Sequence, residues 1–364
     1  MCIRDSMCIA ACMGLVIVVA SSFFKRKNVI SLIFSFAMLG IIGYFALSAL
    51  QSGDESSIGV TLAKQITGLY PISRLFMSYY NFPMYYGMGF YIVLSIVVFY
   101  LFVKIASLKY GLLNTLANTK SSYANDKVSY ERKSVFFSLY QKELGRFLSS
   151  YMAVLNAGLG VILLCVFSIC FLFNSVGQIG NSAGIENINE YLSNLAPVFI
   201  ASMLSLSCPA ASSISLEGKN IWILKSSPVE VKTILNAKIA VNLTLHLIGY
   251  MISVSVFMLK LDMSPIQVMN LVIVPICYSL FIMVIGISLN KKYPNYDWDS
   301  EMIVVKQSLP VIVTGIISMI TLITPILLNW FFNLPIIFVL QAVSVILLAI
   351  SFRVYIKMTK LNFI

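Results

Sequence analysis

Long apolar runs, separated by short polar segments, dominate the pattern of this sequence. Nine runs are close to the ~20 residues that a membrane-spanning helix needs. Because the runs are continuous, they predict helices; the strands of a membrane β-barrel would be ~10 residues long and alternating. We therefore predict an all-α polytopic membrane protein with about nine transmembrane helices, three followed by a unit of six. The expected spans are 7–24, 29–50, 84–103, 151–173, 191–212, 239–259, 266–289, 309–329 and 334–352.

The composition supports this class of protein. Hydrophobic residues make up 59% of the chain and charged residues 11%, whereas a soluble domain has ~25% charged residues. The seven Cys are scattered and form no C-x-x-C pair, so small packing residues are a better interpretation than a disulfide or metal framework.

The distribution of positive charge predicts the topology. Lys and Arg concentrate in cytoplasmic loops, and alternating the nine spans with 25–28 inside places 21 of the 25 basic residues inside. The N-terminus is then outside and the C-terminus in the cytoplasm. The net charge of +11 is thus spread over helix ends, and we expect no nucleic-acid partner.

The chain divides by its polar segments. We expect a partial first membrane unit with three spans at 1–108, a cytoplasmic linker at 109–135, and a second unit at 136–364. The leader MCIRDS before Met7 is too short and too polar for a signal peptide. It resembles a non-native leader, so we expect the chain to begin partway through a longer protein.

Two polar stretches have helical patterns of their own. In 134–151, apolar residues recur at helical spacing around Lys142, Glu143 and Arg146, with Ser134 as N-cap. This pattern favours an interfacial helix along the inner leaflet over a juxtamembrane end with solvated charges.

The second stretch, SLEGKNIWILKSSPVEVKTILNAK at 215–238, is a charged island between apolar runs. Ser227, Pro228 and Glu230 match a capping box, which predicts a helix from 228. We expect a helix–turn–helix at the cytoplasmic surface.

Chemical motifs are scarce. The sequence has no G-x-x-x-x-G-K-[ST] phosphate-binding loop and no His/Cys/Asp/Glu cluster with metal spacing, so we expect no cofactor, no metal and no catalytic residue. His246 lies within a span, where a neutral His bonded to a neighbouring helix is favoured over a functional site.

Three polar segments carry a family resemblance. The stretch from Ser215 resembles the cytoplasmic S-x-E-G-x-x-x-W-x-L-K-S-x-P motif of bacterial ABC transporter permeases of the type-2 exporter class. PNYDWDSEMIVVKQS at 294–308 is similar to the P-x-x-x-W-x-x-E-x-x-x-x-K-Q-S segment of that family, and QKELGRFLSS at 141–150 to its connecting helix. The resemblance covers 136–364, and 7–108 would be the last three spans of a similar upstream unit.

The resemblance implies a permease subunit of an ATP-driven exporter of unknown substrate, in the plasma membrane of a bacterial cell. Such a subunit is not itself an enzyme and pairs with a separate cytosolic ATP-binding subunit. The loop 213–238 would be the coupling helix, with Trp222 as an apolar anchor; a place in the lipid headgroup belt is the other interpretation of Trp222. The implied contact residues are Glu217, Gly218, Trp222, Lys225 and Pro228, followed in the second loop by Trp298, Glu301 and Lys306.

The alternative is a polytopic membrane protein of another class, either a non-transporting scaffold or a lipid-modifying enzyme. Its candidate cluster is Asp297, Asp299 and Glu301, which could hold a divalent cation. A solvated loop balanced by neighbouring Lys residues is the simpler interpretation.

Overall fold

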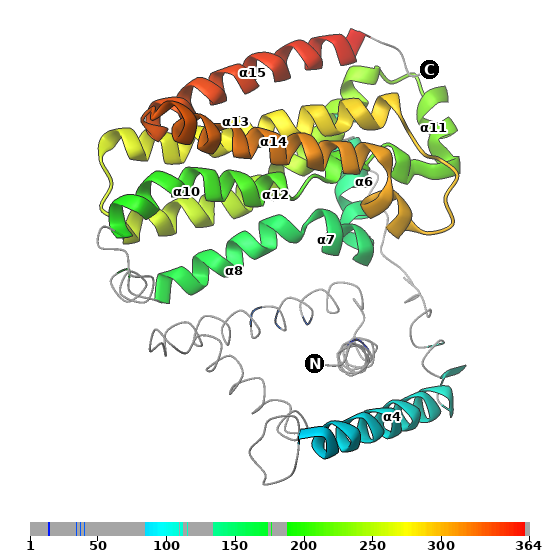
Figure 1. The fold of residues 1–364 in the computed structure, drawn as a ribbon. Helices are drawn as coiled ribbons and strands as arrows, with labels where there is room; N and C mark the ends of the chain where they lie inside the picture. Colours follow the sequence, from blue (N-terminus) through cyan, green and yellow to red (C-terminus); the bar gives the residue numbers. More distant parts are fainter. Residues whose placement is uncertain are drawn as a thin grey trace. The chain divides into compact units, whose positions relative to one another are not determined.

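The computed structural model describes residues 84–108, 134–173 and 188–360, together with residues 14, 34, 37, 40, 110, 111, 115 and 176. The chain forms two compact units, Met1–Val128 and Ser129–Ile364. Within the described ranges every regular element is a helix and no strand occurs (Figure 1). The predicted all-α class is therefore confirmed for this part of the chain.

In the first unit, the structure describes helix α4 (Met84–Leu108). It contains the span expected at 84–103, although its apolar stretch Ile92–Ile105 is shorter than the spans of the second unit. The spans expected at 7–24 and 29–50 lie outside the described residues.

The second unit begins with an amphipathic helix and a bent helix pair. Helix α6 (Val135–Ser149) starts after Ser134, whose Oγ accepts a hydrogen bond from the N–H of Phe137 at 3.3 Å, which confirms the predicted N-cap. Helices α7 (Tyr151–Ala157) and α8 (Leu159–Phe173) then meet at a 62° bend. The run expected as one span, 151–173, is thus broken at Gly158, as is common where glycine interrupts a helix.

The remaining elements form a bundle of long helices with short helical turns at one end. The long helices are α10 (Ile188–Ser205), α12 (Val231–Lys260), α13 (Pro265–Lys292), α14 (Leu309–Phe332) and α15 (Ile336–Lys360). The short elements are η2 (Pro209–Ala211), η3 (Ser215–Asn220), α11 (Ile221–Ser226) and the π-helix η4 (Ile303–Gln307).

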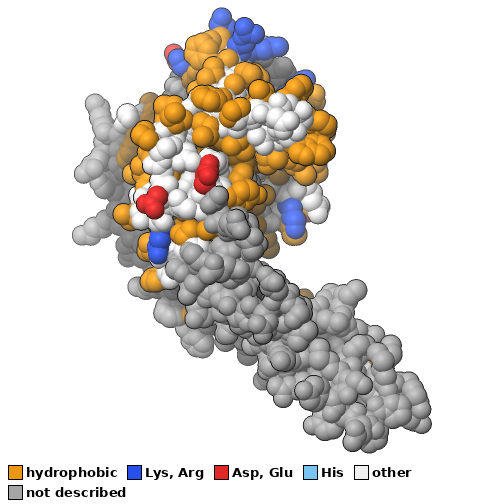
Figure 2. Space-filling view, turned by 60° about the vertical axis from the view of Figure 1, so that its left-hand side comes forward, with side chains coloured by type: hydrophobic (Ala, Val, Ile, Leu, Met, Phe, Trp, Pro, Cys, Tyr) orange, Lys and Arg blue, Asp and Glu red, His pale blue; other side chains and the backbone are white. Residues whose placement is uncertain are grey.

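Five helices among the described residues are long and apolar enough to cross a membrane, and the bent pair α7–α8 would be a sixth. The predicted count of nine is not confirmed. Apolar side chains cover much of the face seen in Figure 2, and Lys and Arg lie toward its edges. On α14, Met319 and Ile320 are 64% and 60% exposed, which suits a helix surrounded by lipid rather than water.

Helix α13 is the core of the bundle, packed against α10, α12, α14, α15 and η2. Small residues allow the closest approaches between helices, as is usual in membrane bundles. A Cβ added to Gly160 would lie 2.0 Å from the carbonyl oxygen of Met203, so α8 and α10 are in backbone contact there. A Cβ on Gly286 would lie 2.8 Å from Sγ of Cys208, which fixes α13 against the turn after α10.

Candidate functional site

The segment 215–238 folds as two helical pieces with a break between them. Residues of η3 and α11 form the first piece, and α12 begins at Val231. The predicted capping box is wrong, because Ser227 Oγ donates back to the carbonyl oxygen of Leu224 at 2.8 Å and closes α11. Glu230 is the N-cap residue of α12, without a side-chain cap bond.

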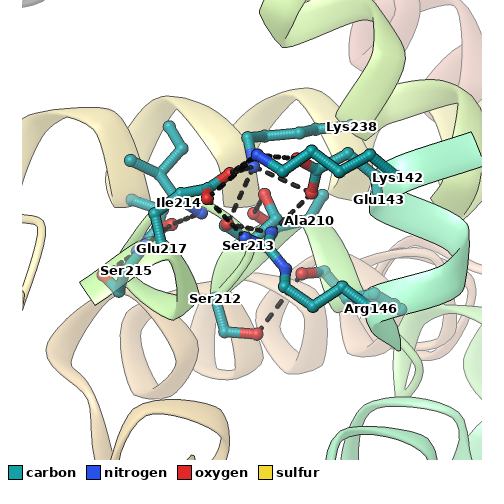
Figure 3. Close-up of polar contacts among 12 residues, drawn as sticks. Lys142, Glu143, Arg146, Ala210, Ser212, Ser213, Ile214, Ser215, Glu217 and Lys238 are labelled. Carbon is teal, nitrogen blue, oxygen red and sulfur yellow. Dashed lines mark hydrogen bonds and ion pairs between the residues drawn. The ribbon is translucent and has the colours of Figure 1, made fainter. Parts of the chain in front are cut away.

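Lys238 is the centre of a buried ion-pair cluster at this end of the bundle (Figure 3). Its Nζ lies 2.8 Å from Oε1 of Glu217 and 2.9 Å from Oε2 of Glu143. The same Nζ donates a hydrogen bond of 3.0 Å to the carbonyl oxygen of Ser213. One ammonium group from α12 thereby joins α6, η3 and the chain that follows η2.

Arg146 and Lys142 of α6 complete the ion-pair cluster. Arg146 Nη1 lies 2.7 Å from Oε2 of Glu217, and its Nη2 lies 2.5 Å from Oε2 of Glu143. Nη2 also donates to the carbonyl oxygen of Ser213 at 3.0 Å. Lys142 Nζ lies 3.2 Å from Oε2 of Glu217. Both carboxylates are therefore shared between cations of α6 and α12.

The charged side chains of the ion-pair cluster that meet at Lys238 are buried. The side chain of Lys238 is 0% exposed, and those of Glu143 and Glu217 are 5% exposed. Removing one partner of such a pair strands a buried charge, although an apolar replacement of the whole set can be as stable. The ion-pair cluster therefore serves above all to fix how the three segments meet.

Two buried asparagines hold the polar backbone next to the ion-pair cluster. Asn290 Oδ1, on α13, accepts from the N–H groups of Ile214 and Ser215 at 2.7 and 3.1 Å. Asn242 Oδ1, on α12, accepts from the N–H of Ala210 at 3.1 Å. The turn after α10 is thus anchored by polar side chains of two long helices.

The two loops that carried the family resemblance pack together. Trp298 Nε1 donates to the carbonyl oxygen of Ser215 at 2.9 Å, and its ring covers Gly218. Gly218 has φ 56° and ψ −140°, a backbone conformation that is essentially restricted to glycine. A Cβ there would also lie 3.3 Å from the Trp298 ring.

The other predicted contact residues of the first loop face outward. Trp222 on α11 is 63% exposed, and Pro228 is exposed in the break before α12. Exposed Lys225 lies over the ring of Tyr296, with Nζ 5.8 Å from its centroid. Burial, with a smaller contribution from Glu217, raises the pKa of Tyr296. The structure places Glu217 and Gly218 inside and these three residues at the surface.

In the second loop, Glu301 and Lys306 are exposed. Ser150, between α6 and α7, donates a hydrogen bond to Glu301, while Lys306 lies on η4. Asp297 pairs with Lys219 at 3.4 Å. Among the described residues no group of three His, Cys, Asp or Glu could hold a metal ion, so Asp297, Asp299 and Glu301 do not form the cation site considered in the alternative.

His246 is held by neighbouring helices, as its favoured interpretation predicts. Its Nδ1 lies 2.7 Å from Oγ of Ser279 on α13, and its Nε2 lies 2.5 Å from the carbonyl oxygen of Ser207. Because a carbonyl oxygen accepts only, Nε2 carries the proton, and Nδ1 accepts from the hydroxyl. The imidazole is thereby satisfied in its neutral form.

Sequence reasoning missed the ion-pair partners of Glu217. The sequence pattern placed Glu143 and Arg146 on an interfacial helix and Lys238 at the end of the loop 213–238, without pairing any of them with Glu217. One signal was available, since Lys238 lies at helical spacing with Ile234 and Leu235, both buried. A cation on the apolar face of a membrane helix requires a buried anion.

Together these residues define a helical protein with several helices suited to cross a membrane, joined at one end by a buried ion-pair cluster. Residues 161–359 match the model of a protein family described as "Putative ATP-binding cassette". The match covers more than half of the chain, so the chain belongs to this family. Comparison with curated proteins and with solved structures gives no match.

Membership of this family contradicts the resemblance to permeases. The description of the family names the ATP-binding component of ABC systems. The prediction of a permease subunit energised by a separate ATP-binding subunit is therefore wrong. An association with ABC transport machinery remains supported. The local packing explains why the motif misled: Glu217 and Gly218 are required by the fold itself, through the ion-pair cluster and the Trp298 ring. The scaffold and lipid-enzyme alternative is not better supported.

Proposed function

We propose that this chain is a membrane-integral component of ABC transport machinery, in which the ion-pair cluster transmits movement between polar segments and membrane helices. The observation that carries the proposal is Lys238, whose Nζ contacts Glu143 of α6, Glu217 of η3 and the backbone at Ser213. A displacement of α6 or of η3 must therefore either move α12 or break a buried ion pair.

We further propose that the ion-pair cluster lies at the cytoplasmic face of a bacterial plasma membrane, in a chain of about nine spans. The charge asymmetry of the sequence supports this orientation, with 21 of 25 basic residues on the proposed inner side. The apolar runs at 7–24 and 29–50, together with α4, support the additional spans.

The description of the family as an ATP-binding cassette supports an action of nucleotide on this chain. The sequence contains no G-x-x-x-x-G-K-[ST] segment, which in ATP-hydrolysing cassettes cradles the phosphates. We propose that the chain responds to nucleotide through the ion-pair cluster without hydrolysing it. Release of phosphate from ATP by the purified chain would contradict this part of the proposal.

Hydrogen–deuterium exchange of the full chain in lipid nanodiscs tests the coupling. With saturating Mg-ATP, we expect the exchange of α6 and of residues 207–227 to change together in the unmodified chain. In Lys238→Met the two segments should change by different factors, whereas Lys357→Met, at an exposed position of α15, should behave as the unmodified chain. Nucleotide binding, measured separately by calorimetry, establishes saturation. An unchanged exchange of both segments contradicts the proposed function.

A further inference from the structure

Two cavities lie end to end along α10, on the side that faces α14. The first has a volume of about 570 Å³ and the second about 420 Å³, both within the ~300–1,000 Å³ of typical ligand sites. Ser202, Leu322 and Ile323 line both cavities. The two volumes are therefore parts of one groove, here called the α10–α14 groove.

The polarity of the α10–α14 groove changes along its length. The first cavity lies near the ion-pair end of the bundle, where Asn156, Ser205, Thr314 and Ser318 contribute polar groups. The second cavity lies toward the opposite ends of α8, α12 and α14. Its walls are almost wholly apolar and include four phenylalanines, which are Phe167, Phe171, Phe199 and Phe257. A ligand that fills the groove must be polar at one end and hydrocarbon-like at the other.

Two hydroxyl groups in the first cavity have no protein partner among the described residues. Ser205 and Ser318 are each 6% exposed and line the cavity from facing helices. By contrast, buried Ser344 donates to the carbonyl oxygen of Leu340 in its own helix at 2.7 Å. Both hydroxyl groups open into the first cavity rather than into packed protein. Because a hydroxyl group can both donate and accept, the pair is suited to bind a ligand oxygen between α10 and α14.

Charge complementarity limits the polar end of the ligand. The residues that line the groove include no Lys, Arg, His, Asp or Glu. A charged head group would enter this space without a counter-ion, at a large desolvation cost. A head with hydroxyl or ester oxygens instead matches the hydroxyl groups of Ser205 and Ser318.

We propose that the α10–α14 groove binds a neutral single-chain amphiphile, such as a monoacylglycerol, with its oxygen-bearing head at Ser205 and Ser318 and its chain along the phenylalanines. The inference does not depend on the proposed coupling function, because none of the ion-pair residues lines the groove.

Photolabelling of the full chain in nanodiscs tests the proposal. The probe is a monoacylglycerol with a diazirine on its acyl chain, and the labelled peptides are mapped by mass spectrometry. We expect label on the peptides that contain Phe167 and Phe199. An unlabelled monoacylglycerol should compete about tenfold better than the fatty acid of equal chain length, whose carboxylate would be buried without a partner.

Two variants and one control locate the site. Gly315 lines the first cavity, and a Cβ built on it meets nothing within 4 Å, so Gly315→Leu should fill the groove and abolish this label without a clash. Ser205→Ala with Ser318→Ala should weaken competition by about tenfold, as for the loss of two ordinary hydrogen bonds. The control Ser344→Ala, away from the groove, should leave labelling unchanged.

The proposal is overturned by label spread over the outer helix faces, or by label on the same peptides that Gly315→Leu does not reduce. Equal competition by the neutral and anionic amphiphiles overturns the neutral head group. Melting temperatures of the variants, compared with that of the unmodified chain, show whether a loss of label reflects unfolding. If Gly315→Leu unfolds, the double serine variant and the competition series still test the proposal.

Discussion

The ammonium group of Lys238 lies 2.8 Å from Oε1 of Glu217, and the two side chains are 0% and 5% exposed. Glu143 approaches the same ammonium group from α6. The ion pairs of Lys238 thus join residues up to 95 positions apart in the sequence, and replacing this lysine tests them.

Lys238→Met should destabilise the chain by about 3–5 kcal/mol, because it leaves buried carboxylates with fewer partners. Thermal unfolding in detergent or nanodiscs, followed by circular dichroism, measures the effect. Lys357→Met is the matched control, since Lys357 is exposed on α15, and it should stay within about 0.5 kcal/mol of the unmodified chain. Equal effects of the two substitutions would show that Lys238 is not held by the ion-pair cluster.

The double variant Lys238→Met, Glu217→Gln should be less destabilised than the sum of its single variants. Contacting residues of one ion-pair network are energetically coupled, by about 0.5–3 kcal/mol. The four unfolding free energies of this double-mutant cycle measure the coupling. Strict additivity would mean that the 2.8 Å contact contributes no interaction energy.

Gly218→Ala should destabilise the chain by about 1–3 kcal/mol, because alanine rarely adopts the backbone conformation found there. The added Cβ would also meet the Trp298 ring at 3.3 Å. The control is Gly145→Ala in α6, where a Cβ meets nothing within 4 Å and the change should stabilise the helix slightly. A neutral result at Gly218 would be incompatible with its positive φ.

Gly160→Ala should weaken the packing of α8 on α10. The new Cβ would lie 2.0 Å from the carbonyl oxygen of Met203, so the helices must separate, and overpacking of this kind typically costs about 1–3 kcal/mol. Gly315→Ala, with open space around the position, serves as control. Gly160→Ala should raise the rate of proteolysis and lower the unfolding temperature. Gly315→Ala should change neither quantity.

The two loop tryptophans should respond differently to replacement. Trp298→Phe loses the hydrogen bond to the carbonyl oxygen of Ser215 and should destabilise the chain by about 1 kcal/mol. Trp222→Phe, at a side chain that is 63% exposed, should change stability by less than about 0.5 kcal/mol. A larger effect at Trp222 would reveal a contact that this arrangement of α11 does not contain.

Periodicity and composition were enough to predict the helical class, the N-cap at Ser134 and the apolar nature of the long helices. Predictions from periodicity and composition failed where one side chain can form either of two hydrogen bonds. Ser227 fits a capping box in the sequence, but its hydroxyl closes the preceding helix instead. The run 151–173 is largely apolar, and only its glycines distinguish a bent pair from a straight span.

The candidate site was predicted in part. Glu217, Gly218 and Trp298 were selected from a resemblance that proved misleading about function, and the structure brings them together for reasons of packing and backbone geometry. Glu143 and Lys238 were not selected, because their pairing joins α6 to α12 across a long separation in sequence. A local sequence pattern cannot predict a contact between residues so far apart in the chain.

The carbonyl oxygen of Ser213 receives hydrogen bonds from both Arg146 and Lys238, each of 3.0 Å. A backbone carbonyl is present whatever the side chain. These two bonds therefore place no demand on the side chain at position 213. Relatives of this chain should retain a cation at 146 and at 238 whichever residue stands at 213, so substitution patterns among them should reveal the two donors but not their acceptor.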